Sequence, residues 1–328
     1  EFRRVLFRSD VLIIIYPLFC KNNYCFCLMR KEFNVTYYVR APGTCGEFLQ
    51  GSINGQSFLV TCPINRYSYA LSNVKHPFSQ HYCALQPKSA LARQLVQRLL
   101  EIKNKDKTCP PVYVRSDIIQ GKGMASSSAD ISVTAMATAL AMDYNLSLKE
   151  LEQICLSVEP TDASFYQGVT QFDYIKGTIS QPLGMCPPLK ILVFDEGGSI
   201  DTITFNQQVD LQAKILEKES IIRESLDLFK RGLHTHDINL IGQAATLSAF
   251  GNQRILYKAN LYDFHDIGNY YNSVGTIIAH SGTIMGLLFP VDYSRIDDCK
   301  QEIIRKLPHL SYVDTVETTN EGLTYIKR

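Results

Sequence analysis

Apolar residues in the first half of the chain recur with the spacings typical of strands and of helices. Short runs rich in β-branched and aromatic residues predict strands at residues 36–40, 58–62, 67–71 and 112–116. Helical spacing of leucines predicts a helix at residues 90–102, and residues 130–142 are apolar nearly all round, so that helix should be buried. A third helix should run to about residue 157, because Ser147 and Glu150 form a capping-box pattern.

The second half alternates in the same way. A strand is expected at residues 190–195, followed by one long amphipathic helix at 211–230 and a helix at 238–249 that Asp237 caps. Residues 283–289 and 312–316 predict strands, with a helix between them at 296–307. Helices and strands mixed in both halves indicate an α+β protein.

Three prolines within residues 181–189 mark the one soft boundary, because proline disfavours both a helix and a central strand. We therefore expect two closely packed domains, residues 29–185 and 186–328. Residues 1–28 precede the periodic sequence, and we expect them to be a non-native or disordered extension. A targeting segment is the alternative, because arginines precede an apolar run there, but Pro17 interrupts the run.

Composition excludes several classes of protein. The 33 basic and 32 acidic side chains leave a net charge of +1, without the basic excess of a nucleic-acid binder. The apolar run near the start is shorter than the roughly 20 residues of a membrane span. Ten scattered cysteines without a C-x-x-C pair favour reduced thiols in the cytoplasm over a zinc site.

The most informative string is G-K-G-M-A-S-S-S-A-D at residues 121–130, just before the buried helix. Glycines and small residues let backbone N–H groups approach an anion, and the start of a helix favours a phosphate. The string lacks the order of a Walker P-loop and of a dinucleotide fingerprint. It predicts a phosphate-binding loop, and a serine-capped buried helix is the alternative.

This string resembles the second motif of the GHMP kinases, the superfamily of galactokinase, homoserine kinase and mevalonate kinase. A-P-G-T-C-G-E-F-L-Q-G at residues 41–51 is similar to the first motif, and A-H-S-G-T-I-M-G-L-L at 279–288 to the third. The resemblance implies a two-domain GHMP kinase fold. Its N-terminal domain is a ribosomal-protein-like α/β ATP-binding domain, and its C-terminal domain is a ferredoxin-like α+β domain.

Within the superfamily, the motif sequences are most similar to those of the L-threonine kinases of cobalamin biosynthesis. The shared strings include V-T-C-P-I at residues 60–64 and E-P-T-D at 159–162. The resemblance implies transfer of phosphate from ATP, with Mg²⁺, to the hydroxyl of free L-threonine, in a protein that could be a homodimer. A homoserine or serine kinase, or a catalytically silent regulator of the same fold, are the alternatives.

The resemblance also assigns roles to residues. The nucleotide phosphates should contact Gly121, Lys122, Gly123, Met124, Ala125, Ser126, Ser127 and Ser128. Ser127 occupies the position that binds Mg²⁺ in relatives, and a carboxylate should complete that site. Glu159 is the first candidate, then Glu152 and Asp130, each of which could instead be a surface or capping residue.

Asp162 aligns with the aspartate that takes the proton of the accepting hydroxyl in several GHMP kinases, or it only positions that hydroxyl. Glu47 is the expected partner of the substrate ammonium. Arg66, or the amides of Ser281, Gly282 and Thr283, are expected to bind its carboxylate, and His280 to touch substrate or phosphate. Thr44 stands where mevalonate kinases carry lysine, so no lysine from that motif assists a base.

Overall fold

The computed structural model describes residues 36–73, 83–103, 109–198 and 210–328, together with the backbone of three strands nearer the N-terminus. These strands are β1 (Phe7–Arg8), β2 (Val11–Cys20) and β3 (Asn23–Arg30), which pair in one antiparallel sheet. That residues 1–28 are an extension stays a prediction.

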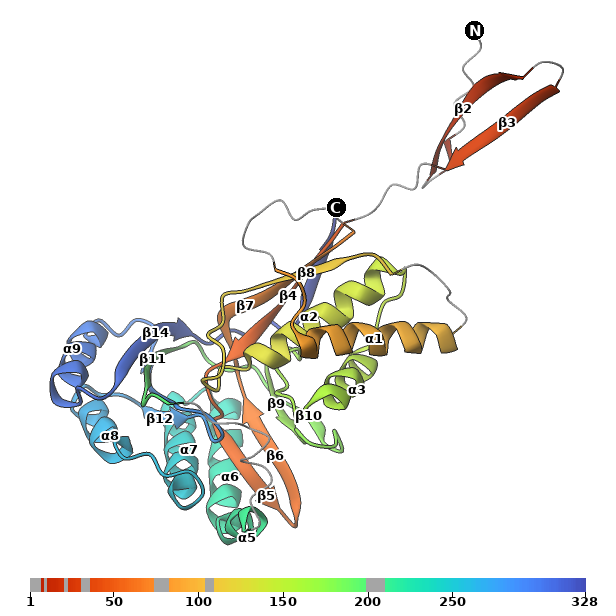
Figure 1. The fold of residues 1–328 in the computed structure, drawn as a ribbon. Coiled ribbons are helices and arrows are strands. Elements are labelled where there is room, and N and C mark those ends of the chain that lie inside the picture. The colour runs from red at the N-terminus through yellow and green to blue at the C-terminus, as the bar shows by residue number, and fades with distance from the viewer. Residues whose placement is uncertain are drawn as a thin grey trace.

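An antiparallel sheet with the order β15-β4-β7-β8 organises the first half of the fold (Figure 1). Its strands are β4 (Tyr37–Thr44), β7 (Pro63–Ser72), β8 (Val112–Ser116) and β15 (Thr324–Lys327). The accompanying helices are α1 (Pro87–Ile102), α2 (Ser126–Ala141) and α3 (Leu148–Val158). Because α2 contacts the sheet as well as α1 and α3, nearly all of its side chains are buried, as its apolar sequence predicts.

A second antiparallel sheet, with the order β10-β9-β6-β5, adjoins the first. It contains β5 (Leu49–Ile53), β6 (Gln56–Thr61), β9 (Val169–Phe172) and β10 (Ser180–Gly184). Pro182 lies on the edge strand β10, where a missing N–H donor is tolerated.

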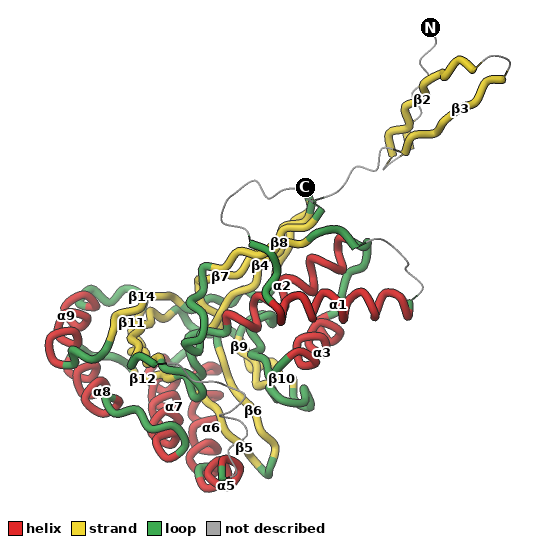
Figure 2. The backbone as a smooth tube through the Cα atoms, in the orientation of Figure 1, coloured by secondary structure: helices red, strands yellow, loops and turns green. Residues whose placement is uncertain are grey.

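A third antiparallel sheet has the order β12-β13-β11-β14. Its strands are β11 (Leu189–Asp195), β12 (Gly275–Ile278), β13 (Ile284–Pro290) and β14 (Ser311–Glu317). The helices are α5 (Leu211–Glu217), α6 (Glu219–Thr235), α7 (Ile238–Gly251), α8 (Leu261–Tyr270) and α9 (Ile296–Lys306), with a 3-10 turn, η1, at Asn252–Arg254. Helices α7, α8 and α9 contact the third sheet, whereas α5 and α6 contact β5 of the second sheet (Figure 2).

The two halves share one hydrophobic core. Buried side chains of β4 and α2 belong to the same cluster as those of α6 and β13, for example Val39, Ile131, Phe229 and Leu288. The final strand β15 returns to the first sheet, where Thr324 pairs with Arg40 of β4. That the domain boundary lies between residues 185 and 186 therefore stays a prediction. The C-terminal strand β15 belongs to the sheet of the first half.

Predictions that rest on short stretches of sequence, such as helix caps, agree with the structure. The strand at residues 112–116 is confirmed without a shift, and so are the capping box of Ser147 with Glu150 and the Asp237 cap of α7. The single helix expected at 211–230 is wrong. It is two helices, because the backbone at Lys218 leaves helical geometry (φ −89°, ψ 4°).

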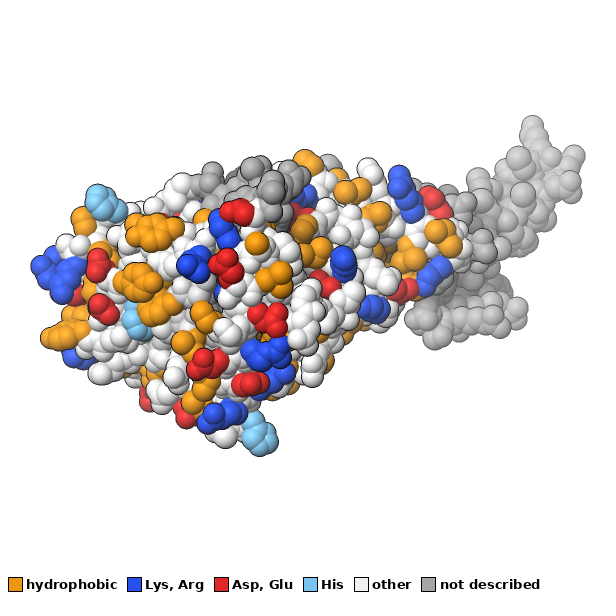
Figure 3. All heavy atoms as spheres, turned by 90° about the horizontal axis from the view of Figure 1, so that it is seen from below, with side chains coloured by type: hydrophobic (Ala, Val, Ile, Leu, Met, Phe, Trp, Pro, Cys, Tyr) orange, Lys and Arg blue, Asp and Glu red, His pale blue; other side chains and the backbone are white. Residues whose placement is uncertain are grey.

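Charged side chains of both signs are interspersed on the face of the molecule in Figure 3. This agrees with the net charge of +1. Among the helices that the structure describes, none combines the length and apolar character needed to cross a membrane.

Candidate functional site

The loop before α2 has a backbone that glycine favours. Gly121 and Gly123 have φ of 72° and 92°, and Ala125, with φ 56°, is the N-cap of α2. The first N–H groups of a helix have no partner within it, so those of the first turn are available to an anion. This loop and the first turn of α2 line a cavity of about 470 Å³.

The three glycine-bearing motifs meet at this loop through their backbones. From the first motif, Thr44 N donates to Met124 O at 3.1 Å and Gly46 N to Gly123 O at 3.0 Å. From the third motif, Thr283 N donates to Lys122 O at 3.3 Å. A Cβ on Gly123 would lie 2.3 Å from Ala279 Cβ, so only glycine permits this approach.

Lys122 does not line the cavity. Its Nζ forms an ion pair with Asp195 Oδ2 at 2.7 Å and donates to Gly198 O at 3.0 Å. Burial acts to raise the pKa of Asp195, but the hydrogen bonds that its carboxylate accepts, with that from Lys122 the strongest, and the charge of Lys122 together lower the pKa. Lys122 therefore supports the loop from outside in this structure.

Ser127 and Glu159 lie together on the cavity wall, as a shared metal site requires. Ser127 Oγ donates to Glu159 Oε1, and Lys88 of α1 forms an ion pair with Glu159 Oε2. The donors are oxygens, which Mg²⁺ prefers. Among the described residues no three His, Cys, Asp or Glu side chains gather as a metal site, so the protein would supply few ligands. Mg²⁺ often binds in this way, through one or two protein oxygens plus phosphates and water.

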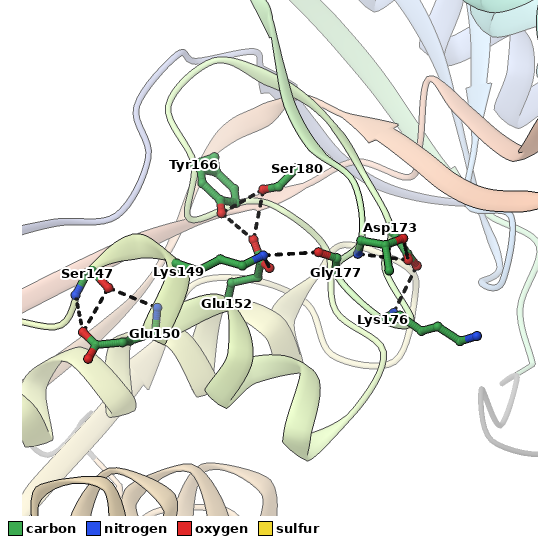
Figure 4. Close-up of polar contacts among 10 residues, drawn as sticks. Ser147, Lys149, Glu150, Glu152, Tyr166, Asp173, Lys176, Gly177 and Ser180 are labelled. Carbon is green, nitrogen blue, oxygen red and sulfur yellow. Dashed lines mark hydrogen bonds and ion pairs between the residues drawn. The ribbon is translucent and has the colours of Figure 1, made fainter.

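The structure separates the two other carboxylate candidates for this site. Glu152 does not line the cavity, because α3 directs it into a buried polar cluster (Figure 4). There it accepts from Tyr166 Oη at 2.6 Å and Ser180 Oγ at 3.0 Å. Asp130 does line the cavity, where it accepts a hydrogen bond from Ser68 and where burial raises its pKa.

Asp162 lies beside the first turn of α2 and lines the same cavity. Its backbone N donates to Ser128 Oγ at 3.1 Å, and Ser128 Oγ lies 3.4 Å from its Oδ2. Burial raises the pKa of this carboxyl group, and the negative charges of Glu47 and Glu159 raise it further. A carboxylate with a raised pKa is a better proton acceptor near neutral pH.

Glu47 lines the cavity and His280 lies behind it. Glu47 Oε2 accepts from His280 N at 2.8 Å and lies 3.1 Å from His280 Nδ1, while His280 Nε2 lies 3.0 Å from Ser248 Oγ. Burial lowers the pKa of His280 well below its usual value, so the imidazole is neutral. His280 therefore contacts Glu47 and does not face the cavity itself.

The remaining acceptor candidates differ in position. Ser281 lines the cavity, whereas Gly282 and Thr283 pack behind it against the loop of the second motif. Arg66 is separate, because its Nε forms an ion pair with Asp314 Oδ2 at 2.7 Å, linking β7 to β14. The structure thus offers no support for Arg66 as a carboxylate ligand.

Several cavity residues carried no sequence signal. They include Lys88, Ser89, Gln120 and Tyr174, none of which lies within a quoted motif. Lys88 and Ser89 belong to α1, Gln120 directly precedes the glycine loop and Tyr174 follows β9, so only the tertiary fold brings these residues to one wall. A neighbouring cavity of about 620 Å³ shares Gln86, Ser89, Gln120 and Asp130 with the first.

Comparisons with known proteins point in one direction. The family model of the GHMP kinase N-terminal domain matches residues 90–168. An L-threonine kinase of Salmonella typhimurium (strain LT2) is 31% identical over 260 residues, which cover 76% of this chain and 81% of that protein. An L-threonine kinase of Citrobacter freundii is 28% identical over 270 residues, covering 81% and 91%. The crystal structure of homoserine kinase from Cytophaga hutchinsonii matches with a TM-score of 0.61 at 13% identity, covering 93% of this chain and 100% of that one.

Proposed function

Because the chain belongs to the L-threonine kinase family of the GHMP kinases, we propose that it phosphorylates free L-threonine with ATP. The hydroxyl oxygen of threonine bonds to the γ-phosphorus as the bond from that phosphorus to the β-γ bridging oxygen breaks. ADP leaves, and the hydroxyl proton passes to a base. The product, O-phospho-L-threonine, would supply the aminopropanol linker of cobalamin.

One observation carries this proposal: Ser128 connects the start of α2 to Asp162. A nucleotide phosphate at the α2 N-terminus and a hydroxyl at Asp162 would share one cavity. Phosphoryl transfer needs little covalent chemistry from the protein beyond such positioning and the stabilisation of charge. The glycine loop would stabilise the charge and Asp162 would position the hydroxyl, and Ser128 holds the two side by side.

The loop from Gly121 to Ser128 would hold the phosphates through its backbone N–H groups. Ser127 and Glu159 would hold Mg²⁺, which when bound neutralises charge on the phosphates. Lys88 also lines the cavity and contributes a positive charge beside Glu159. The neighbouring cavity past Gln86 and Gln120 offers room for the rest of the nucleotide.

Asp162 would take the proton from the threonine hydroxyl. A carboxylate is too weak a base to ionise an alcohol in advance, but the proton can leave late in a loose transition state. Ser128 fixes the carboxyl group in place for this step. The burial that raises its pKa strengthens it as a base.

Glu47 would bind the ammonium group of threonine, and the backbone around Ser281 its carboxylate. Both groups lie in motifs that contact the phosphate loop directly, so binding the amino acid and binding the nucleotide are mechanically linked.

Several cysteine thiols are buried and reduced: Cys45, Cys62, Cys155, Cys186 and Cys299. They favour a reducing compartment, and we place the reaction in the cytoplasm.

The proposal is tested by ADP release from the full chain with ATP and Mg²⁺ across L-threonine, L-serine, L-homoserine and mevalonate. We expect turnover to be highest with L-threonine, with O-phosphothreonine identified by mass spectrometry. Some turnover of L-serine is expected, because one methyl group discriminates by only about 1–3 kcal/mol. Highest turnover with another alcohol would replace the substrate, and no turnover with any of them would contradict the kinase activity.

A further inference from the structure

We call the part of the cavity that Glu47 and Ser281 line the acceptor end. Two lysines that no motif indicated are buried behind it. Lys258 is 1% exposed and Lys218 is 5% exposed. A buried ammonium group is costly unless polar or charged groups surround it. Neither lysine takes part in the phosphoryl transfer proposed above, so their burial needs another explanation.

Lys258 connects the third motif to the loop that follows η1. Its Nζ donates to Gly282 O at 2.8 Å and lies 4.0 Å from Glu196 Oε2. Gln253 fixes the same loop, because its side chain accepts from Lys258 N at 2.8 Å and donates to Lys258 O at 3.0 Å. The ammonium group of Lys258 is therefore held at a defined place beside the third motif.

Lys218 reaches the same region from the break between α5 and α6. Its Nζ donates to Asn252 Oδ1 at 2.9 Å, and Asn252 Nδ2 donates to His280 O at 3.4 Å. His280 contacts Glu47 Oε2 through its backbone N–H and its ring. A continuous chain of polar contacts thus runs from Lys218 to the cavity wall.

Both ammonium groups also act on Glu47 through their charge. Burial raises the pKa of Glu47, whereas the His280 N–H, and then the charges of Lys258 and Lys218, lower it. Burial likewise lowers the pKa of both lysines, and the Glu47 charge opposes that. Without the lysines, Glu47 would stay protonated over a wider pH range and attract a cation only weakly.

We propose that Lys218 and Lys258 are positioning residues that make Glu47 an ammonium-binding carboxylate, so that the acceptor site selects alcohols carrying a neighbouring amino group. The inference rests on the proposed function, to which it adds the selection of the amino group. It explains why ionic groups are buried on the far side of Glu47 from the cavity.

The test compares the Kd of L-threonine with that of (R)-3-hydroxybutyrate, which lacks the amino group. Calorimetry of the full chain with a non-hydrolysable ATP analogue gives both values. We expect the unmodified protein to bind L-threonine roughly 10- to 100-fold more tightly, the effect of one charged hydrogen bond. Lys258→Met and Lys218→Met should each reduce this preference by about 10-fold through the L-threonine Kd, with the analogue unchanged.

A pH series separates charge from structure. The titratable groups that face Glu47 are Cys45, Asp162, Tyr174, Lys218, Lys258 and His280. In either lysine variant, the rise of L-threonine affinity with pH should occur at a higher pH than in the unmodified protein, because Glu47 ionises at a higher pH once a neighbouring positive charge is removed. In a Glu47→Gln background, the lysine substitutions should have no further effect on either ligand.

Lys149→Met is the matched control. Lys149 also pairs with a buried carboxylate, that of Glu152, but outside the cavity (Figure 4). We expect this variant to keep the full preference for L-threonine. If Lys258→Met does not fold, Lys218→Met provides the comparison, since it leaves the Lys258 contact with Gly282 in place.

The inference would be contradicted if the lysine substitutions weakened the binding of both ligands equally. It would also be contradicted if they kept their full effect in the Glu47→Gln background, since a lysine that only supports the fold behaves in that way. Turnover of L-threonine with the preference unchanged in both lysine variants overturns the inference alone. Binding with the expected preferences but without any O-phosphothreonine overturns the proposed function alone.

Discussion

The two ends of the cavity are built in different ways. The phosphate end is mainly one continuous stretch, residues 121–128, whose backbone depends on its own glycines and the start of α2, and which the first and third motifs hold through backbone hydrogen bonds. The acceptor end gathers side chains from the first motif, the α5–α6 break, α7, the following loop and the third motif: Glu47, Lys218, Ser248, Asn252, Lys258 and His280. The proposed anion site is thus largely a local property of the chain, whereas the proposed amino-acid site depends on the tertiary fold.

The electrostatics of the two ends differ as well. At the phosphate end the loop lysine, Lys122, is paired with Asp195, which leaves backbone N–H groups as the main positive feature of the loop. At the acceptor end, buried ionisable groups control one another's charge. We therefore expect the acceptor end to respond to pH more strongly than the phosphate end.

The largest effect should come from the residue that joins the two ends. Asp162→Asn removes the proton acceptor but keeps the size of the side chain, and we expect kcat to fall by roughly 10²- to 10⁴-fold. Steady-state ADP release measures this, with circular dichroism as the control for folding. Near-normal kcat would mean that Asp162 only positions the hydroxyl.

The phosphate end should fail when its backbone approach is blocked. In Gly123→Ala, the added Cβ meets Ala279 Cβ at 2.3 Å and the backbone has φ 92°, so we expect kcat/KM for ATP to fall by about 100-fold. Gly121→Ala is the matched control, since a Cβ there meets nothing within 4 Å and adds only the strain of φ 72°, about 1 kcal/mol. Equal losses in the two variants would show that loop strain, and not contact with the third motif, matters.

The acceptor end should be sensitive to acid. The pKa of His280 is lowered by burial, so this residue stabilises the fold above the unfolded pKa of about 6.5, and that contribution is lost as the pH falls below it. Below that pH, each decrease of one pH unit should lower the unfolding free energy of the unmodified protein by about 1.4 kcal/mol more than that of His280→Asn. Urea unfolding at several pH values measures the difference.

His309→Asn, at an exposed position, should keep the unmodified slope. If the slope of His280→Asn also stays unchanged, then His280 is not the group that makes the acceptor end sensitive to acid.

The smallest effect should come from outside both ends. Ser147→Ala removes the N-cap hydrogen bond of α3, and we expect the unfolding free energy to fall by about 1 kcal/mol. Because this cap is at the N-terminal end of α3, whereas Glu159 lines the cavity from its C-terminal end, KM for ATP and for L-threonine should not change. A changed KM for either substrate would show that α3 influences the cavity after all.

The same contrast explains how much the sequence could predict. Elements with local signals, such as the Ser147 capping box and the Asp237 cap, were found at the right positions. The break at Lys218 was missed because the apolar stripe continues through it, and only the polar contact with Asn252 distinguishes that lysine from its neighbours. Strand β15 was missed because it is short, exposed and paired with a strand near the other end of the chain.

The same distinction applies to the predicted residues of the site. The strings that hold Ser127, Glu159 and Asp162 could be recognised, and the structure brings these residues to one cavity. Spacing along the chain could not show that Arg66 pairs with Asp314, or that Glu152 is buried elsewhere. The Arg66 pair joins segments far apart in sequence, and the burial of Glu152 depends on the packing of Tyr166 and Ser180 against α3.

The central claim is that nucleotide and amino acid occupy one cavity with Asp162 between them. We would test it by NMR, measuring relaxation of the L-threonine methyl protons in the presence of the full chain, a non-hydrolysable ATP analogue and Mn²⁺ in place of Mg²⁺. The account predicts strong paramagnetic relaxation that excess Mg²⁺ removes and that Glu47→Gln weakens. L-threonine that binds without any relaxation by Mn²⁺ would place the two ligands in separate sites and contradict the account.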